Sequence, residues 1–134
     1  MLTCIEGQSQ YLNFNWCAGE DFNIPLKFLD VNGEARDLTH ATIYFTLSRY
    51  LSVGDPIIAI EVTGDDHSDA EEGESNIFVP ADDSKDLSGD YHVAIKVVFS
   101  DPEDEDEDGN WVVGRGKACL EANTTSQEPE DEEE

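Results

Sequence analysis

Basic residues are scarce in this chain, and their scarcity excludes several kinds of partner. The 134 residues contain 7 Lys and Arg against 32 Asp and Glu, which gives a formal net charge of −25. A nucleic-acid backbone would repel such a chain, because no basic stripe is present to neutralise its phosphates. An anionic membrane surface would repel it for the same reason. We therefore expect neither a nucleic acid nor a membrane among its partners.

Long apolar runs and helical periodicity are also missing. No run approaches the ~20 apolar residues that a transmembrane helix needs. The first ten residues, MLTCIEGQSQ, lack the basic region and the long apolar region of a signal peptide. No stretch repeats apolar residues at intervals of three and four over a useful length, so the sequence predicts almost no helix.

Cysteine is rare, and the cysteines are not spaced as pairs. Cys4, Cys17 and Cys119 are odd in number, widely separated and form no Cys-x-x-Cys pair. This pattern argues against a disulfide framework or a zinc site and indicates reduced thiols in a protein assembled in a cytosol. We interpret all three as small hydrophobic side chains in or near the core.

Side chains arranged for catalysis or metal binding are equally hard to find. His40, His67 and His92 have no second histidine or cysteine at ligand spacing. The scattered serines lack a Gly-x-Ser-x-Gly elbow, so a catalytic triad has no support. We therefore expect no catalytic, cofactor-binding or metal-binding residues, no cofactor and no enzymatic activity.

The acids that dominate the composition are clustered. Six lie in Gly64–Glu74, seven in Asp101–Gly109 and six in Ser126–Glu134, which leaves 13 acids against 7 bases in the rest of the chain. The part that can form a core is therefore close to an ordinary soluble domain in charge. We expect the excess acid to lie in solvated loops and in a C-terminal tail.

One acidic cluster contains a partial calcium motif. Asp104, Asp106 and Asp108 precede Gly109, as in the first half of an EF-hand loop, where alternate carboxylates converge on one cation. The twelfth position is Arg115 where such a loop supplies a glutamate, and the flanking segments read as strands. A solvated acidic loop is therefore favoured, and calcium binding stays open as an alternative.

Alternation of apolar and polar residues is the main structural signal. Strands with one apolar face need two packed sheets to bury those faces. Residues 1–123 are therefore predicted to form one all-β domain, an immunoglobulin-like antiparallel β-sandwich of about seven strands. Residues 124–134 are predicted to be a disordered acidic tail. The alternating segments are Tyr11–Ala18, Phe22–Asp30, Ala41–Arg49, Ile57–Thr63, Asn76–Pro80, Tyr91–Phe99 and Trp111–Ala122.

Individual residues sharpen this prediction. Asn32-Gly33 is a strong hairpin signal, because both residues tolerate positive φ. Pro25 suggests an edge strand or a bulge. Gly114 and Gly116 would leave one face of the last strand bare, a pattern that often marks a bulge or a close approach by another backbone.

The sequence also predicts side-chain orientations in the last strand, and it predicts no conformation for the first ten residues. In the last strand, Val112, Ala118 and Leu120 are predicted to face inward, with Arg115, Lys117 and Glu121 facing outward. The conformation of Leu2–Gln10 is left undecided.

Three stretches together resemble a family of small phage domains. They are GEDFNIPLKFLDVNGEARDLTHATIYFTLSR, LSGDYHVAIKVVF and GNWVVGRGKACLEA, and the resemblance covers residues 10–122. Together, the three stretches are similar to the immunoglobulin-like N-terminal domain of upper baseplate proteins of tailed phages and to related short virion proteins. The matching positions are Gly19-Glu20, Asp30 with Gly33, Asp37-Leu38-Thr39 with Ala41, Arg49, Gly89 with Tyr91, and Gly114 with Gly116.

The resemblance implies a non-enzymatic structural protein of a tailed-phage virion, assembled in the host cytoplasm. Its partners would be other virion structural proteins, present in multiple copies in the tail, baseplate, neck or head. Two alternatives remain: an acidic inhibitor whose carboxylates mimic DNA phosphates, and a capsid-decoration or calcium-binding adhesion module.

Overall fold

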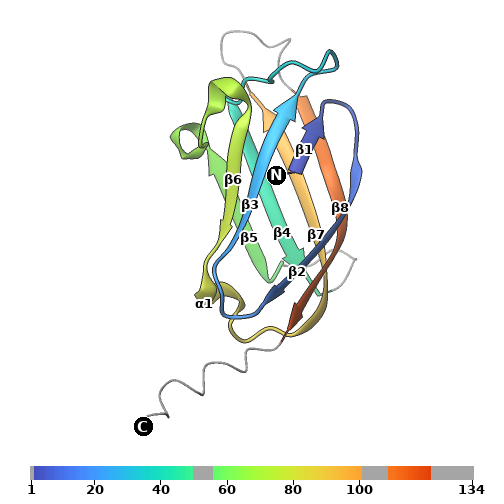
Figure 1. The fold of residues 1–134 in the computed structure, drawn as a ribbon, viewed down its shortest axis with the longest axis vertical. Coiled ribbons are helices and arrows are strands. Elements are labelled where there is room, and N and C mark those ends of the chain that lie inside the picture. The colour runs from blue at the N-terminus through green and yellow to red at the C-terminus, as the bar shows by residue number, and fades with distance from the viewer. Residues whose placement is uncertain (1, 50–55, 101–108, 122–134) are drawn as a thin grey trace.

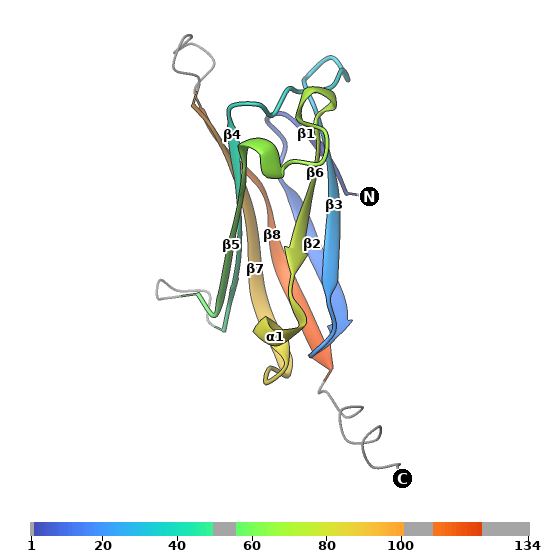
Figure 2. The ribbon, with the colours of Figure 1, turned by 90° about the vertical axis from the view of Figure 1, so that its left-hand side faces the viewer.

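The computed structural model describes residues 2–49, 56–100 and 109–121. These residues form two packed β-sheets, so the predicted all-β sandwich is confirmed (Figures 1 and 2). The predicted tail, 124–134, lies outside the described ranges. No helix within those ranges is long and apolar enough to cross a membrane.

The sandwich has one small sheet and one large sheet. The small sheet holds three strands in the order β1 (Leu2–Ile5), β3 (Phe22–Leu29), β6 (Glu74–Val79). The large sheet holds five strands in the order β2 (Gln10–Cys17), β8 (Gly109–Glu121), β7 (Gly89–Phe99), β4 (Ala41–Ser48), β5 (Ile58–Thr63). Short helical turns η1 (Gly64–Asp66), η2 (Ala70–Glu72) and α1 (Ala81–Ser84) lie in the connections around β6.

All seven predicted strands are present. The structure adds an eighth strand and two parallel pairs. The undecided segment Leu2–Gln10 supplies an eighth strand, β1. Four strand pairs are antiparallel, as predicted, and the pairs β1–β3 and β2–β8 are parallel, which the prediction did not include. These strands do not pair with their neighbours in the chain, which removes the antiparallel constraint that a tight hairpin imposes.

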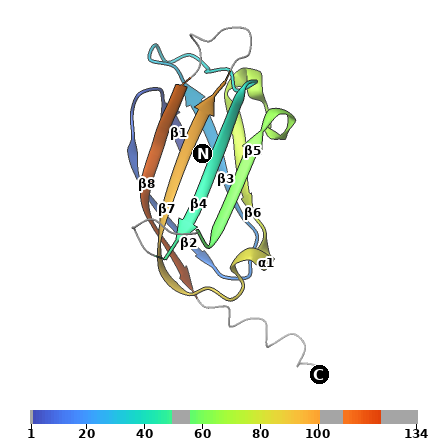
Figure 3. The same cartoon turned by 180° about the vertical axis from the view of Figure 1, so that it is seen from behind.

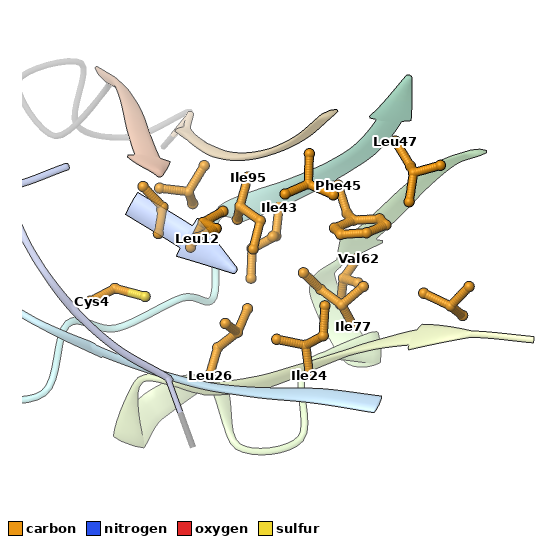
Figure 4. Close-up of a cluster of buried hydrophobic side chains, with 14 of the residues drawn as sticks. Cys4, Leu12, Ile24, Leu26, Ile43, Phe45, Leu47, Val62, Ile77 and Ile95 are labelled. Carbon is orange, nitrogen blue, oxygen red and sulfur yellow. The ribbon is translucent and has the colours of Figure 1, made fainter. Parts of the chain in front are cut away.

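The core lies between the sheets, where the alternating apolar side chains meet. Figure 4 shows Ile24, Leu26 and Ile77 of the small sheet pointing toward side chains of the large sheet. Among the latter, Phe45 and Ile95 are completely buried. Burial of this kind contributes about 25 cal/mol for each Å² of apolar surface, which is why the period-two pattern governs the fold.

The last strand departs from strict alternation at a bulge. Ile95 pairs with Gly114 while Lys96 pairs with Val112, so Val113 is an extra residue in β8. Trp111 and Val113 are therefore the buried residues, and the predicted inward position of Val112 is wrong. One inserted residue reverses the face of every side chain on one side of it. Beyond the bulge, Ala118 and Leu120 face inward as predicted, and Arg115, Lys117 and Glu121 face outward.

The paired glycines lie beside this bulge, where the backbone of β2 comes close. A Cβ on Gly116 would overlap the carbonyl oxygen of Leu12. A Cβ on Gly114 would lie 2.5 Å from the carbonyl oxygen of Gln10. Both expectations for this pair, a bulge and a close backbone, are confirmed.

The Asn32-Gly33 turn closes a short hairpin, in which Leu29 and Ala35 form an antiparallel bridge, but it does not join two strands of the same sheet. The carboxylate of Asp30 accepts hydrogen bonds from the amides of Asn32 (2.8 Å) and Glu34 (3.0 Å), and only Gly33 of the turn has positive φ. The flanking strands β3 and β4 lie in different sheets. Leu38 is buried, and its amide donates to Ala70 O, which carries the chain across to the other layer.

Pro25 lies in β3, the central strand of the small sheet, so its predicted place on an edge strand is wrong. The pairing of β1 with β3 nevertheless starts at Leu26. On that side Pro25 has no partner strand among the described residues. A residue without an amide hydrogen is tolerated at such a position, because no ladder bond is lost there.

Candidate docking surfaces

The acids of the described chain gather at the two ends of the sandwich. Only Glu61, Glu74, Asp90 and Glu121 lie within strands; the others lie in connections. The connection that contains η1 and η2 forms one acidic end, and α1 lies at the other (Figure 1). Approach along the long axis is therefore opposed by charge, and the sides of the sandwich are the less acidic surfaces.

Three exposed bases lie on the outer face of the large sheet, which also carries the acids Glu61, Asp90 and Glu121. Lys96 on β7 and Arg115 and Lys117 on β8 are exposed on the outer face of the large sheet, which Figure 3 views directly. None of the three forms an ion pair with a described residue. We call this surface the basic face and define it by three bases and four neighbours: Tyr44, Thr46, Ala94, Lys96, Val98, Arg115 and Lys117.

The basic face contains a shallow groove. Its volume is about 380 Å³, and Tyr44, Thr46, Ala94, Lys96 and Val98 line it. Ala94 is a small residue directly opposite Thr46 on β4 and Arg115 on β8, so the surface dips between larger side chains. The depression thus lies between β4 and β7, with Lys96 and Arg115 both on its β7–β8 side.

The edges of both sheets offer a second kind of docking surface. Within the described residues, β5 pairs only with β4, and β6 pairs only with β3. Phe78 on β6 is 44% exposed. An unpaired strand edge can accept a strand from another protein through main-chain hydrogen bonds.

A larger pocket lies at one end of the sandwich, and the polar side chains that line it bind to other groups of the same chain. It measures about 560 Å³ and includes Glu6, Gln8, Arg36, Phe99 and Trp111 in its lining. The guanidinium of Arg36 lies 4.0 Å from the centre of the Phe99 ring and 3.7 Å from the Glu6 carboxylate. The indole of Trp111 donates to Gln8 O at 2.9 Å. The polar groups here hold the first connection against the sandwich.

The histidines do not come together. His67, which the sequence places in an acidic loop, is only 6% exposed. Its Nδ1 lies 2.8 Å from Ser75 Oγ and its Nε2 lies 2.9 Å from Ala41 O, so it ties the connection to β4 and β6. His92 lies on β7 on the outer face of the large sheet, and His40 lies in the turn before β4. Sequence reasoning missed the burial of His67, and no local signal marks it.

No group of three or more His, Cys, Asp or Glu side chains among the described residues is arranged to hold a metal ion. The possible calcium ligands Asp104, Asp106 and Asp108 lie outside the described ranges, so that alternative stays untested. Gly109, the last residue of their motif, begins β8.

The three cysteines are free thiols with depressed reactivity. Burial raises the pKa of Cys4 to about 12. Burial also raises the pKa of Cys17, and hydrogen bonding to Asp90 raises that of Cys119. Because the thiolate is the nucleophile, none of these groups is activated for chemistry.

Two residues of the phage-like pattern meet in space although 42 positions separate them. Arg49, at the end of β4, donates from Nη2 to the hydroxyl of Tyr91 at 3.1 Å. The same hydroxyl donates to Ser88 O at 2.9 Å and accepts from the Ser88 amide at 3.1 Å. Gly89 adopts φ 97°, a conformation that favours glycine. The Gly-x-Tyr and Arg positions therefore form one structural corner.

The Asp-Leu-Thr step of that pattern is also structural. The carboxylate of Asp37 accepts from the hydroxyl of Thr39 at 2.6 Å and from its amide at 2.9 Å. The bond from the hydroxyl is the main cause of the lowered pKa of Asp37. The turn places Leu38 in the core.

Comparison with known proteins adds a likeness to solved structures. No protein-family model matches this chain, and no curated protein does. Among solved structures, it is similar to the N-terminal domain of phage TP901-1 ORF48, with a TM-score of 0.52 and 10% sequence identity. The likeness covers 90% of this chain and 95% of that one. At this identity it shows a shared fold.

Proposed function

We propose that this chain is a structural protein of a tailed-phage virion and that it docks on other virion subunits without catalysing a reaction. The fold shared with the N-terminal domain of phage TP901-1 ORF48 carries this proposal, because it extends over nearly all of both chains. The resemblance of the sequence to upper baseplate domains supports it separately. The proposal assigns no catalytic role to any residue.

The finer assignment to the immunoglobulin-like class is part of the proposal. The N-terminal strands β1 and β2 divide between the two sheets, and β8, β7 and β4 form the centre of the larger one. The hydroxyl of Tyr91, at the start of β7, bonds to the backbone of Ser88. A tyrosine at that corner, bonded to the backbone just upstream, is a hallmark of immunoglobulin-like sandwiches.

The charge distribution supports docking through the sides. Like charges at both ends oppose end-on contact between copies, whereas each strand of the large sheet and the edge strand β6 carries at most one acid. A protein repeated around a particle axis needs this kind of directional preference. Its neighbours would contact a sheet face or continue a sheet edge.

Mass spectrometry of purified particles, followed by imaging of the particles, tests the proposal. We expect the chain in a fixed ratio to the major tail or head proteins, and density for a sandwich that contacts its neighbours through one side. Its absence from particles would contradict the proposal. Capture of a host nucleic-acid enzyme that duplex DNA displaces would favour the DNA-mimic alternative instead.

A further inference from the structure

Strand β2 lies at an edge of the large sheet and lacks the features that protect the other edges. Within the described residues it pairs with β8 alone. It contains no charged residue, proline or glycine, and its register against β8 runs without a bulge. The other edge strands differ, because β5 carries Glu61, β6 carries Glu74 and β1 is only 4 residues long. Charge, proline, bulges and shortness are what prevent an edge from pairing with another chain, so the β2 edge is the one that fits a partner strand.

The main-chain groups of alternate β2 residues face the open side of this edge. The amide of Ala18, directly after β2, donates to Glu121 O of β8 at 2.9 Å. Successive residues of a strand direct their N–H and C=O groups to opposite edges, so the even-numbered residues of β2 also bond toward β8. The groups of Tyr11, Asn13 and Asn15 therefore point away from the sheet. Each copy of the chain offers three amides and three carbonyls there.

The charge distribution favours the same edge. Strands β1, β2 and β3, which lie together on the right of Figure 2, contain no acid, although the chain has 32. On β8, the residues paired with Tyr11 and Asn13 are the bases Arg115 and Lys117, and Glu121 lies at the end of the strand. A second copy of this acidic chain therefore meets less repulsion at the β2 edge than at either end of the sandwich.

We propose that two copies of this chain pair edge to edge through β2, antiparallel and about a two-fold axis at Asn13. The outer face of one sheet must continue as the outer face of the other, so the axis passes through a residue. An axis at Asn13 sets Asn13 opposite itself and Tyr11 opposite Asn15 of the second copy. All three open amides of each copy then donate to open carbonyls of the other. The two large sheets become one continuous sheet.

The side chains of β2 suit this pairing. Asn13 carries both donors and an acceptor, so two facing copies of its amide group can bond to each other. Tyr11, which is 69% exposed, gains Asn15 of the second copy as a neighbour. On the inner side, half-buried Phe14 borders an apolar depression of about 290 Å³ and gains Leu12 of the second copy opposite it. Aromatic side chains that water reaches in one copy are covered in the pair.

Most charged side chains of the two copies stay apart in this arrangement. The two copies of Lys117, which pairs with Asn13, would be three strand spacings apart, about 14 Å. The two copies of Glu121 would be separated by about 26 Å along the strands. Both distances exceed the Debye length of ~8 Å at physiological salt. Glu20 of one copy and Glu6 of the other lie at the same end of the pair, in turns that cross to the small sheet, so added salt should strengthen the association.

Sedimentation equilibrium of the full chain tests the proposal. A reducing agent is present, so that the free thiols do not cross-link copies. At about 0.3 M NaCl the average mass should rise from 14.9 kDa toward twice that value as the concentration increases from about 10 to about 500 μM. Lowering NaCl to about 20 mM should weaken the association about tenfold or more. A mass that stays at 14.9 kDa throughout would overturn the proposal.

Amide hydrogen exchange locates the contact within the molecule. The amides of Tyr11, Asn13 and Asn15 should exchange about tenfold more slowly, or slower still, in the concentrated sample than in the dilute one, because pairing protects them. The amides of Asn76 and Phe78, on the edge strand β6, should exchange at the same rate in both samples. Slower exchange on β6 with no change on β2 would place the interface at another edge and overturn the proposal.

Proline at the centre of β2 is the first variant. Asn13→Pro has a matched control in Asn76→Pro, because both asparagines lie on edge strands and direct their amides away from the neighbouring strand. Neither substitution removes a bond of the ladder within the chain. Asn13→Pro should weaken dimerisation about tenfold or more, and Asn76→Pro should leave it within about twofold. Circular dichroism checks the fold of both, and equal effects on dimerisation would contradict pairing through β2.

Lysine at the same position is a second variant that adds no backbone constraint. Asn13→Lys sets two lysines directly opposite each other at the axis, and like charges at such positions destabilise paired strands. The substitution also makes the net charge of −25 less negative, so a general charge effect would strengthen association. We expect weaker dimerisation than in the natural chain. Stronger dimerisation would overturn the pairing at Asn13.

Discussion

Tyr91 joins three parts of the molecule through one hydroxyl group. Its ring is buried in the core, and its oxygen bonds to the amide and the carbonyl of Ser88 and to the guanidinium of Arg49. The turn before β7 and the end of β4 are therefore held to each other. The Tyr91 side chain thus connects the turn before β7 to the end of β4, which the residues of the turn alone would not do.

Replacing Tyr91 with Phe should lower the free energy of unfolding by about 1–3 kcal/mol, because the backbone groups of Ser88 and the Arg49 side chain lose a partner. Urea unfolding measures the change. Tyr11→Phe is the matched control, since Tyr11 is 69% exposed and its hydroxyl lies in water. Equal effects of the two substitutions would argue against the corner as a stabilising contact.

The Cys4 thiol makes stability depend on alkaline pH. Its folded-state pKa is raised from 9.0 to about 12, so the unfolded chain loses this proton first. The contribution of the thiol is complete below pH 9 and is lost as pH rises toward 12. The stability advantage of the natural chain over Cys4→Ala should therefore shrink above pH 9, by at most ~1.4 kcal/mol per pH unit. Urea unfolding of both proteins at pH 8 and 10.5 checks this, and a constant difference would contradict it.

Among the elements, β8 holds the large sheet together. It pairs in parallel with β2 and antiparallel with β7, and its bulge at Val113 reorients the residues that follow. Gly114 and Gly116 let the backbone of β2 approach more closely than any side chain would permit. The outward bases Arg115 and Lys117 alternate with these glycines, so the same segment shapes both the core and the basic face.

Gly116→Ala should destabilise the protein by about 1–3 kcal/mol or more, because the new methyl group would overlap the backbone of Leu12. Amide hydrogen exchange along β2 should accelerate as that strand is displaced. Gly109→Ala in the same strand has no atom within 4 Å of the new methyl group and should change stability by less than about 0.5 kcal/mol. Unchanged exchange in β2 for Gly116→Ala would contradict the close packing of these backbones.

At the scale of the whole molecule, the separation of charge is the dominant feature. Acids occupy both ends, and exposed bases lie along one side of the large sheet. Repulsion between like charges at each end opposes folding, and we expect it also to oppose end-on contact between copies. Stability and association should both respond to ionic strength.

Raising NaCl from about 10 mM to about 0.3 M should raise the melting temperature, because salt screens repulsion within a chain of charge −25. The double variant Asp65→Asn/Asp66→Asn should show a weaker salt dependence, since it removes two charges from one acidic end. Thermal unfolding followed by circular dichroism measures both effects. A melting temperature that falls with added salt would show that attractive ion pairs outweigh the repulsion.

The sequence by itself determined seven of the eight strands and, apart from the part of β8 before its bulge, which side of each is buried. Alternation predicted the strand at Ala41–Arg49 and the burial of Ala118 and Leu120, and Asn32-Gly33 predicted the turn, because these signals depend on a few neighbouring residues. The tertiary structure alone decided that β3 and β4 enter different sheets, that His67 is buried, and that Lys96 and Arg115 share one face. These outcomes depend on contacts between residues far apart in the chain, and a local pattern carries no information about which distant segment will pack against it.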